Sequence, residues 1–199
     1  SEMCIRDSYY ADLAHHYRQA ALSEEEARYA QLAGESAAAQ FANTEALAYF
    51  SRALQLTEAG DFNGRFALLS ARVEIYDLLG QRDEQAQDLE QMLILADSLS
   101  AVEQALVKLK QANYAFNISD YPAAIQYASQ AITLAQKHDD THTLAAAYAI
   151  WGQALQQQGD YPAAQQQYQA GIVASKEVPS TALATNLKGL GIMMAVSYT

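Results

Sequence analysis

The chain has 199 residues, of which 51% are hydrophobic and 18% are charged, so it carries enough apolar side chains to fold around a core. Its 23 acidic and 12 basic residues give a formal net charge of −11, which argues against direct binding to nucleic acid or to an anionic membrane surface. Cys4 is the single cysteine, so no intrachain disulfide is expected. No apolar run approaches the roughly 18 residues of a membrane span, and no signal-peptide pattern is present, so we expect a cytoplasmic protein.

The first eight and the last four residues differ in character from the rest of the chain. Residues 1–8 and 196–199 are similar to translated adapter sequence that is often left on open reading frames from environmental sequencing assemblies. We therefore expect both ends to be non-native and leave them out of the fold prediction. The remaining residues, 9–195, are predicted to form one helical repeat array that is truncated at its C-terminal end.

Strong helix formers occupy most positions and only three prolines occur, which predicts an all-α fold. The first predicted helices cover Glu24 to Gln40 and a segment that begins with Thr44 as its N-cap. Apolar residues at helical spacing form a stripe along one face of a helix, and in the second helix this stripe is Ala46, Phe50, Ala53 and Leu54. A hairpin with its turn at Gly80 follows, and its stripes are Leu69, Val73, Tyr76 and Leu79, then Ala86, Leu89, Leu93 and Ala96.

A short repeated sequence, Asp-Tyr-Pro-Ala-Ala, occurs at Asp120 to Ala124 and again at Asp160 to Ala164. In the later copy, Gly159 and Asp160 separate two helical stripes, and Pro162 lies in the first turn of the second helix, where its missing N–H costs little. The stripes are Tyr148, Trp151, Gly152 and Leu155, then Ala164, Tyr168, Gly171 and Ile172. The pattern predicts an antiparallel hairpin whose small residues allow the two helices to approach closely.

The helix before Asp120 has two alternative faces. The repeat pattern favours Lys108, Gln111, Ala112 and Ala115, whereas the apolar spacing favours Val102, Ala105, Leu106, Leu109, Ala112 and Phe116. At the C-terminal end, the first-helix pattern that contains Gly152 restarts, one repeat later, with Leu187, Leu190 and Gly191. No second helix follows before Val196, so the final repeat is predicted to be cut in half.

The later copy of the repeat resembles the tetratricopeptide repeat (TPR) family. The residues that carry the resemblance are Tyr148, Trp151, Gly152, Leu155, Gly159, Asp160, Tyr161, Ala164 and Tyr168, with Gly171 in place of a final Ala. The resemblance implies a right-handed α-solenoid of stacked helical hairpins, with repeats of about 40 residues.

The arrangement also resembles the C-terminal repeat region of large bacterial regulators, in which an ATPase module, often with a LuxR-type DNA-binding or adenylate cyclase domain, is fused to such repeats. The segments that carry this second resemblance are Leu13 to Ala20, Ala33 to Glu35, Glu45 to Leu54 and Tyr76 to Gly80.

No phosphate-binding loop, nucleophile elbow or zinc-protease motif is present, so we predict no enzyme activity and no cofactor. One cluster has spacing compatible with a metal site: His138, Asp139, Asp140 and His142. We favour a solvated turn in which Asp139 or Asp140 caps the next helix.

Two other groups of polar residues are interpreted as structural. His15 and His16 point about 100° apart on a helix and so do not converge on one ion. The eight acids from Glu74 to Glu103 are interpreted as a solvated helix face, not as paired catalytic carboxylates.

The TPR resemblance implies a protein–protein interaction or scaffold segment, as a fragment of a larger signalling or transcriptional regulator. The alternative is an effector-sensing segment that controls an attached ATPase or cyclase domain. In the family's register the first helices line a concave face, which here consists of Ser70, Glu74, Asp77, Asn113, Phe116, Asn117, Gln153, Gln156 and Gln157. Because this surface runs from acidic to amide-rich, we expect a protein or peptide partner that presents a basic or polar extended segment.

Overall fold

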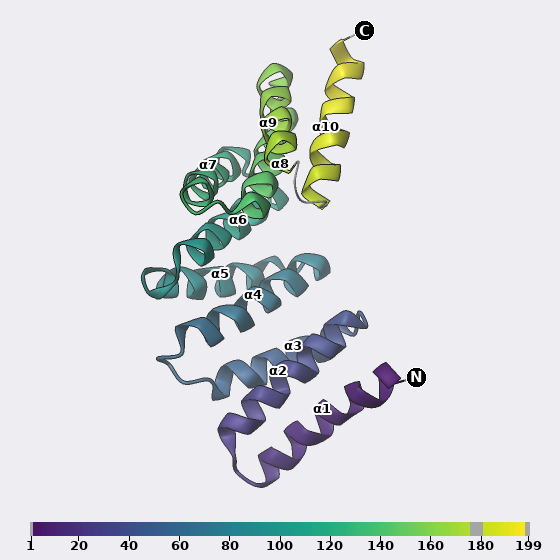
Figure 1. The fold of residues 1–199 in the computed structure, drawn as a ribbon, viewed down its shortest axis with the longest axis vertical. Helices are drawn as coiled ribbons and strands as arrows, with labels where there is room; N and C mark the ends of the chain where they lie inside the picture. Colours follow the sequence, from purple (N-terminus) through teal and green to yellow (C-terminus); the bar gives the residue numbers. More distant parts are fainter. Residues whose placement is uncertain (1, 176–180, 198–199) are drawn as a thin grey trace. The chain divides into compact units, whose positions relative to one another are not determined.

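The computed structural model describes the backbone of residues 2–175 and 181–197 and the side chains of residues 9–175 and 182–192. Over these residues the chain forms ten α-helices, one short 3-10 helix and no strand, which confirms the all-α prediction (Figure 1). The helices are α1 (Glu2–Gln19), α2 (Ser23–Ala39), α3 (Asn43–Leu56), α4 (Phe62–Leu79), α5 (Arg82–Leu95), η1 (Ala96–Ser98), α6 (Ala101–Asn117), α7 (Tyr121–Lys137), α8 (Thr141–Gln157), α9 (Tyr161–Ala174) and α10 (Thr181–Ser197).

The chain divides into two compact units, Ser1–Ser98 and Leu99–Thr199. The first contains α1 to α5 and the second contains α6 to α10. The helix α1 includes residues 2–8, and α10 includes residues 196 and 197, so helical structure continues into both ends that were predicted to be non-native. The boundaries at residues 8 and 195 stay predictions.

Each unit contains two helical hairpins with the same kind of turn. The hairpins are α2–α3 and α4–α5 in the first unit and α6–α7 and α8–α9 in the second. In each turn one residue has a left-handed backbone: φ is 60° at Phe41, 69° at Gly80, 64° at Ser119 and 83° at Gly159. Only two of these four positions have glycine, the residue that adopts this conformation without steric cost.

Asp120 and Asp160 follow the turn and cap the second helices of their hairpins. Each carboxylate accepts a hydrogen bond at 3.1 Å from a backbone N–H in the first turn of its helix, and a proline occupies that turn, as predicted for Pro162. Asp140 caps α8 in the same way, as one of the two alternatives predicted. The prediction that Thr44 caps its helix is wrong, because α3 begins one residue earlier and Ala42 occupies the N-cap with no side-chain hydrogen bond.

A pair of buried positions, with the same sequence spacing each time, recurs in all four hairpins. The pairs are Gly34 and Phe50, Val73 and Leu89, Ala112 and Ala128, and Gly152 and Tyr168. In the two pairs that contain glycine, a Cβ on the glycine would lie 2.7 Å from the aromatic ring, so the glycine leaves the space that the ring occupies. In these two hairpins a glycine on one helix is therefore matched by a large aromatic side chain on the other, which keeps the two helices closely packed.

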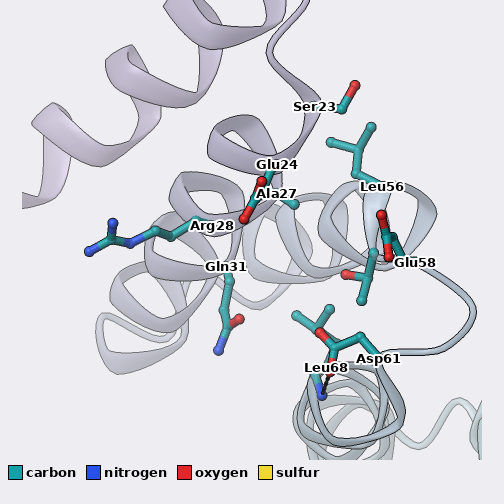
Figure 2. Close-up of a pocket in the computed structure, with 11 residues that line it drawn as sticks. Ser23, Glu24, Ala27, Arg28, Gln31, Leu56, Glu58, Asp61 and Leu68 are labelled. Carbon is teal, nitrogen blue, oxygen red and sulfur yellow. Dashed lines mark hydrogen bonds between the residues drawn. The ribbon is translucent and has the colours of Figure 1, made fainter.

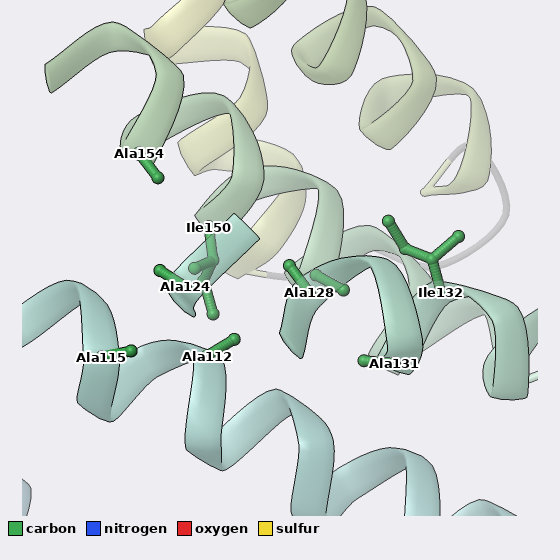
Figure 3. Close-up of a cluster of buried hydrophobic side chains, with 9 residues drawn as sticks. Ala112, Ala115, Ala124, Ala128, Ala131, Ile132, Ile150 and Ala154 are labelled. Carbon is green, nitrogen blue, oxygen red and sulfur yellow. The ribbon is translucent and has the colours of Figure 1, made fainter. Parts of the chain in front are cut away.

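Most of the buried residues in the hydrophobic cluster of the α6–α7 hairpin are alanines (Figure 3). Ala112 and Ala115 of α6 cluster with Ala124, Ala128 and Ala131 of α7. The alternative face of α6 proposed from apolar spacing is wrong at Val102, which is 46% exposed. Small side chains allow the helices to approach closely, and the larger Leu109 and Phe116 pack half-buried beside the cluster.

Two predicted stripes are rotated in the structure. In α5 the buried apolar residues are Leu89, Met92 and Leu95, while Leu93 is 38% exposed. The buried polar residues Gln85 and Asp88 lie on the same face. Because they are polar, the spacing of apolar residues in the sequence does not reveal which face of α5 is buried. In α10, Gly189 and Leu190 pack against Tyr168, whereas Leu187 is 51% exposed and Gly191 faces open space.

Buried ion pairs connect helices of the first unit. Glu26 of α2 is 3% exposed and accepts hydrogen bonds at 2.7 Å from Arg18 of α1 and at 2.7 and 3.0 Å from Arg52 of α3. The hydrogen bond from Arg52 is the largest cause that lowers the pKa of the Glu26 carboxyl below its usual value, and Arg18 acts in the same direction.

A second pair joins α4 to α5. Asp88 is 1% exposed and faces Arg72, with one hydrogen bond of 3.0 Å from Nη2 and an Nε–Oδ2 contact of 2.9 Å that lacks hydrogen-bond geometry. Burial raises the pKa of the Asp88 carboxyl to about 6, and the Arg72 charge offsets only part of that rise.

Candidate binding grooves

The second unit has a groove of about 270 Å³ between its first helices α6, α8 and α10, with one residue of α9 at its base. Its lining residues are Phe116, Gln153, Gln156, Gln157, Tyr168, Thr185, Lys188, Gly189 and Ile192. Three glutamines from one helix give the groove an amide-rich wall, and Phe116 and Ile192 add apolar surface. A surface of this composition suits an extended segment with a polar backbone.

Tyr168 packs between two of the helices that form this groove. Its side chain is 1% exposed and its ring lies against Gly152 of α8 and Gly189 of α10, so it contacts two of the three first helices that border the groove. Burial raises the pKa of the Tyr168 hydroxyl to about 12. The hydroxyl therefore keeps its proton and remains a hydrogen-bond donor at neutral pH.

The Tyr168 hydroxyl sets the orientation of Gln156. It donates a hydrogen bond of 2.8 Å to the side-chain oxygen of Gln156, which leaves the amide nitrogen of that glutamine as the remaining polar end. Gln156 therefore presents donors, which match the carbonyl groups of an extended peptide.

Asn186 fixes α10 at the border of the groove. It is fully buried, lies against Gly171 of α9 and donates a hydrogen bond of 3.1 Å to the carbonyl oxygen of Ala145 in α8. One side chain thus ties α10 to both helices of the preceding hairpin, which places Thr185 and Lys188 at the groove.

The structure brings together four of the nine residues predicted to bind a partner, namely Phe116, Gln153, Gln156 and Gln157. Asn113 and Asn117 lie on α6 but do not line this groove. Ser70, Glu74 and Asp77 lie on α4 in the first unit, where Asp77 accepts hydrogen bonds from Arg82 at 2.5 Å and from Gln85 at 3.3 Å.

Sequence reasoning missed the contributions of Tyr168 and of α10. The sequence pattern predicts only half a repeat here, with Leu187, Leu190 and Gly191 on its stripe, and it does not place Lys188 or Ile192 on the binding surface. The signal that would have found them is Gly189, because a second glycine on a neighbouring first helix is what the Tyr168 ring requires.

The first unit has a larger groove, of about 580 Å³, bordered by α2, the end of α3 and the start of α4 (Figure 2). We call it the α2–α4 groove. Its lining residues are Ser23, Glu24, Ala27, Arg28, Gln31, Leu56, Thr57, Glu58, Asp61, Gly64 and Leu68. It contains three carboxylates and one guanidinium, and none of the nine predicted site residues.

The remaining polar clusters have structural surroundings. His138 and Asp139 lie in the turn between α7 and α8, next to the cap formed by Asp140. His15 is 2.9 Å from the side-chain nitrogen of Gln19 on the same helix. Among the side chains that the structure describes, no group of three or more His, Cys, Asp or Glu residues is arranged to hold a metal ion.

The described helices include none that is both long and apolar enough to cross a membrane.

Comparison with known proteins identifies the fold but no sequence relative. No protein-family model matches the chain, and no curated protein matches it. The crystal structure of BtubC from P. vanneervenii is similar with a TM-score of 0.79 and 14% identity, over 100% of this chain and 85% of that one. The structure of PlcR from Bacillus thuringiensis, in complex with the peptide PapR7 and DNA, is similar with a TM-score of 0.68 and 14% identity, over 88% of this chain and 67% of that one.

A third similar structure is a Signal Transduction ATPase with Numerous Domains from Pyrococcus horikoshii, which carries a tetratricopeptide repeat sensor. Its TM-score is 0.66 at 14% identity, and the match covers 99% of this chain and 34% of that one. At this identity the likeness concerns the fold alone. With its recurrent hairpins and these structural neighbours, the chain has an all-α, TPR-like helical repeat fold.

Proposed function

We propose that this chain is a protein- or peptide-binding segment that performs no reaction of its own. The observation that carries the proposal is the amide-rich groove between α6, α8 and α10, where four residues predicted from the sequence lie together. The fold supports it, because a similar structure was determined with a bound peptide. In this groove Gln153 and Gln157 form hydrogen bonds with the backbone of an extended segment, and Phe116 and Ile192 contact its side chains.

A displayed library of random extended peptides, selected on the purified chain, tests this proposal. The double variant Gln153→Ala and Gln157→Ala should weaken binding of the selected peptides by roughly 1 to 3 kcal/mol if these amides are buried and paired in the complex. Gln166 and Gln169 on α9 lie outside the groove, so their double alanine variant is the matched control. Equal affinity of both variants, with unchanged helix content, would place the binding site elsewhere.

The second candidate function is regulation of an attached ATPase by the repeat segment. The similar structure from Pyrococcus horikoshii, in which a tetratricopeptide repeat sensor belongs to an ATPase, favours this possibility. The flanking coding sequence tests it directly. If an ATPase module is present there, peptides selected on this chain should change the hydrolysis rate of the whole protein, and the Gln153→Ala and Gln157→Ala variant should abolish the effect.

A further inference from the structure

The negative charge of the chain is concentrated in its first unit. Residues 1–98 contain 17 acidic and 7 basic residues, a formal net charge of −10, whereas residues 99–199 contain 6 acidic and 5 basic residues. The field around the first unit therefore attracts cationic partners, and a cleft in it that is lined by carboxylates concentrates this effect.

The α2–α4 groove combines an apolar base with a charged rim. Ala27 of α2 and Leu56 of α3 are half-buried and supply aliphatic surface, while Leu68 of α4 also lines the groove but is only 2% exposed. Glu24, Glu58 and Asp61 supply carboxylates, and Glu24 and Glu58 are both solvent-exposed (Figure 2). Lysine and arginine side chains match this arrangement, since each has a long aliphatic stem that can pack on apolar surface and a charged end that can stay at the rim.

The one cation in the lining does not occupy the groove. Arg28 extends away from Glu58 and Asp61 in Figure 2, and its guanidinium carbon lies 5.8 Å from the centroid of the neighbouring Tyr29 ring. Asp61 is held in place because its carboxylate caps α4, accepting a hydrogen bond of 2.9 Å from the N–H of Gly64. Among the lining residues, no guanidinium therefore lies between Glu58 and Asp61, and Arg65, outside the lining, donates a hydrogen bond of 3.4 Å to the backbone oxygen of Thr57.

We propose that the α2–α4 groove binds a lysine or arginine side chain of an extended, basic segment of a partner protein. The stem of that side chain packs on Ala27 and Leu56, and its charged end pairs with Glu58 and Asp61, with Glu24 on the opposite wall. This site shares no residue with the α6–α8–α10 groove. It is therefore tested separately from the proposed function.

The test uses the whole chain and a fluorescein-labelled peptide in which Arg and Lys alternate with Ser, with binding followed by fluorescence polarisation. The double variant Glu24→Gln and Glu58→Gln removes two charges from the groove, and the control Glu45→Gln and Glu90→Gln removes two exposed charges from elsewhere in the first unit. We expect about a tenfold loss of affinity in the groove variant and about twofold or less in the control. Equal losses would show that the peptide responds to the diffuse field alone and would overturn the proposal.

A second variant blocks the groove without changing charge. Ala27 is half-buried in its wall, so Ala27→Phe fills the space while leaving the carboxylates in place. Binding of the basic peptide should fall about tenfold at unchanged helix content, whereas unchanged binding would overturn the proposal. The Gln153→Ala and Gln157→Ala variant should bind this peptide normally. A loss there instead would assign the basic peptide to the other groove.

Discussion

The two units hold their helices together by different means. All seven basic residues of 1–98 are arginines and all five of 99–199 are lysines. In the first unit Arg18, Arg52, Arg72 and Arg82 each pair with a carboxylate. The second unit relies on alanine clusters and on a tyrosine between two glycines. A planar guanidinium suits a partly buried carboxylate, whereas close packing of small residues requires no charge.

This difference makes pH a probe of the first unit. The pKa of Glu26 is lower in the folded chain than in the unfolded chain, so its stabilising contribution is present above about pH 4.5 and is lost as the pH falls. The pKa of Asp88 is raised to about 6, so its contribution has the opposite sign: it is present at low pH and is lost as the pH rises through that value. The contributions of these two carboxylates to the free energy of unfolding therefore change in opposite directions as the pH changes.

The largest expected effect is that of Arg72→Met. Asp88 is 1% exposed, so removal of its partner leaves a buried charge and should cost about 3 to 5 kcal/mol of unfolding free energy near neutral pH. The loss should shrink at about pH 5, because this is below the Asp88 pKa of about 6 and the carboxyl is then largely protonated with or without Arg72. Urea unfolding at both pH values measures it. The double variant Arg72→Met and Asp88→Asn is the control, and an equal loss in the single variant at both pH values would contradict the assignment.

The counterpart in the second unit is Tyr168→Ala, which should cost about 3 to 5 kcal/mol because it removes a buried ring from between two helices. This loss should be the same at about pH 5 and pH 8, since the tyrosine does not titrate there. Tyr168→Phe keeps the ring and should lose only about 1 kcal/mol with the hydrogen bond to Gln156. A strong pH dependence of the alanine variant would remove the distinction between the two units.

Gly152→Ala should destabilise the second unit by about 1 to 3 kcal/mol, because the added Cβ would lie 2.7 Å from the Tyr168 ring. Gly34→Ala should have a similar effect in the first unit, where Phe50 is at the same distance. Thermal unfolding followed by circular dichroism compares them. The double variant Gly152→Ala and Tyr168→Ala should show less than the summed losses, and simple additivity would mean that the two positions are not in contact.

The sequence predicts the hairpin α8–α9 well and the hairpin α2–α3 poorly, although their packing is alike. Gly152 and Tyr168 have counterparts in the first unit, Gly34 and Phe50, at the same sequence spacing. The turns differ, because Phe41 and Ala42 stand where the later hairpin has Gly159 and Asp160. Tertiary packing forms the same hairpin without those local signals.

The sequence predicts the two grooves less completely than it predicts the hairpins. Gln153, Gln156 and Gln157 are neighbours on one helix face, so the helical spacing of the sequence alone groups them. Lys188 joins them only because Asn186 and Gly189 dock α10 on the preceding hairpin, and these contacts join residues far apart in the sequence. The α2–α4 groove depends on the separation of two helices, which no local pattern encodes.

The smallest expected effect concerns the unusual turn of the first unit. Phe41 has φ of 60° and is 86% exposed, so it adopts a left-handed conformation that is unfavourable for a bulky residue and gains little from burial. Phe41→Gly should therefore raise the unfolding free energy by about 0.5 to 1 kcal/mol, since the strain relieved exceeds the entropy lost by glycine. Gly159→Ala, at the equivalent turn of the second unit, should lower it by a similar amount. Urea midpoints of both variants measure the difference. If Phe41→Gly were destabilising, Phe41 would contribute stabilising contacts that outweigh its backbone strain, and the two turns would not be equivalent.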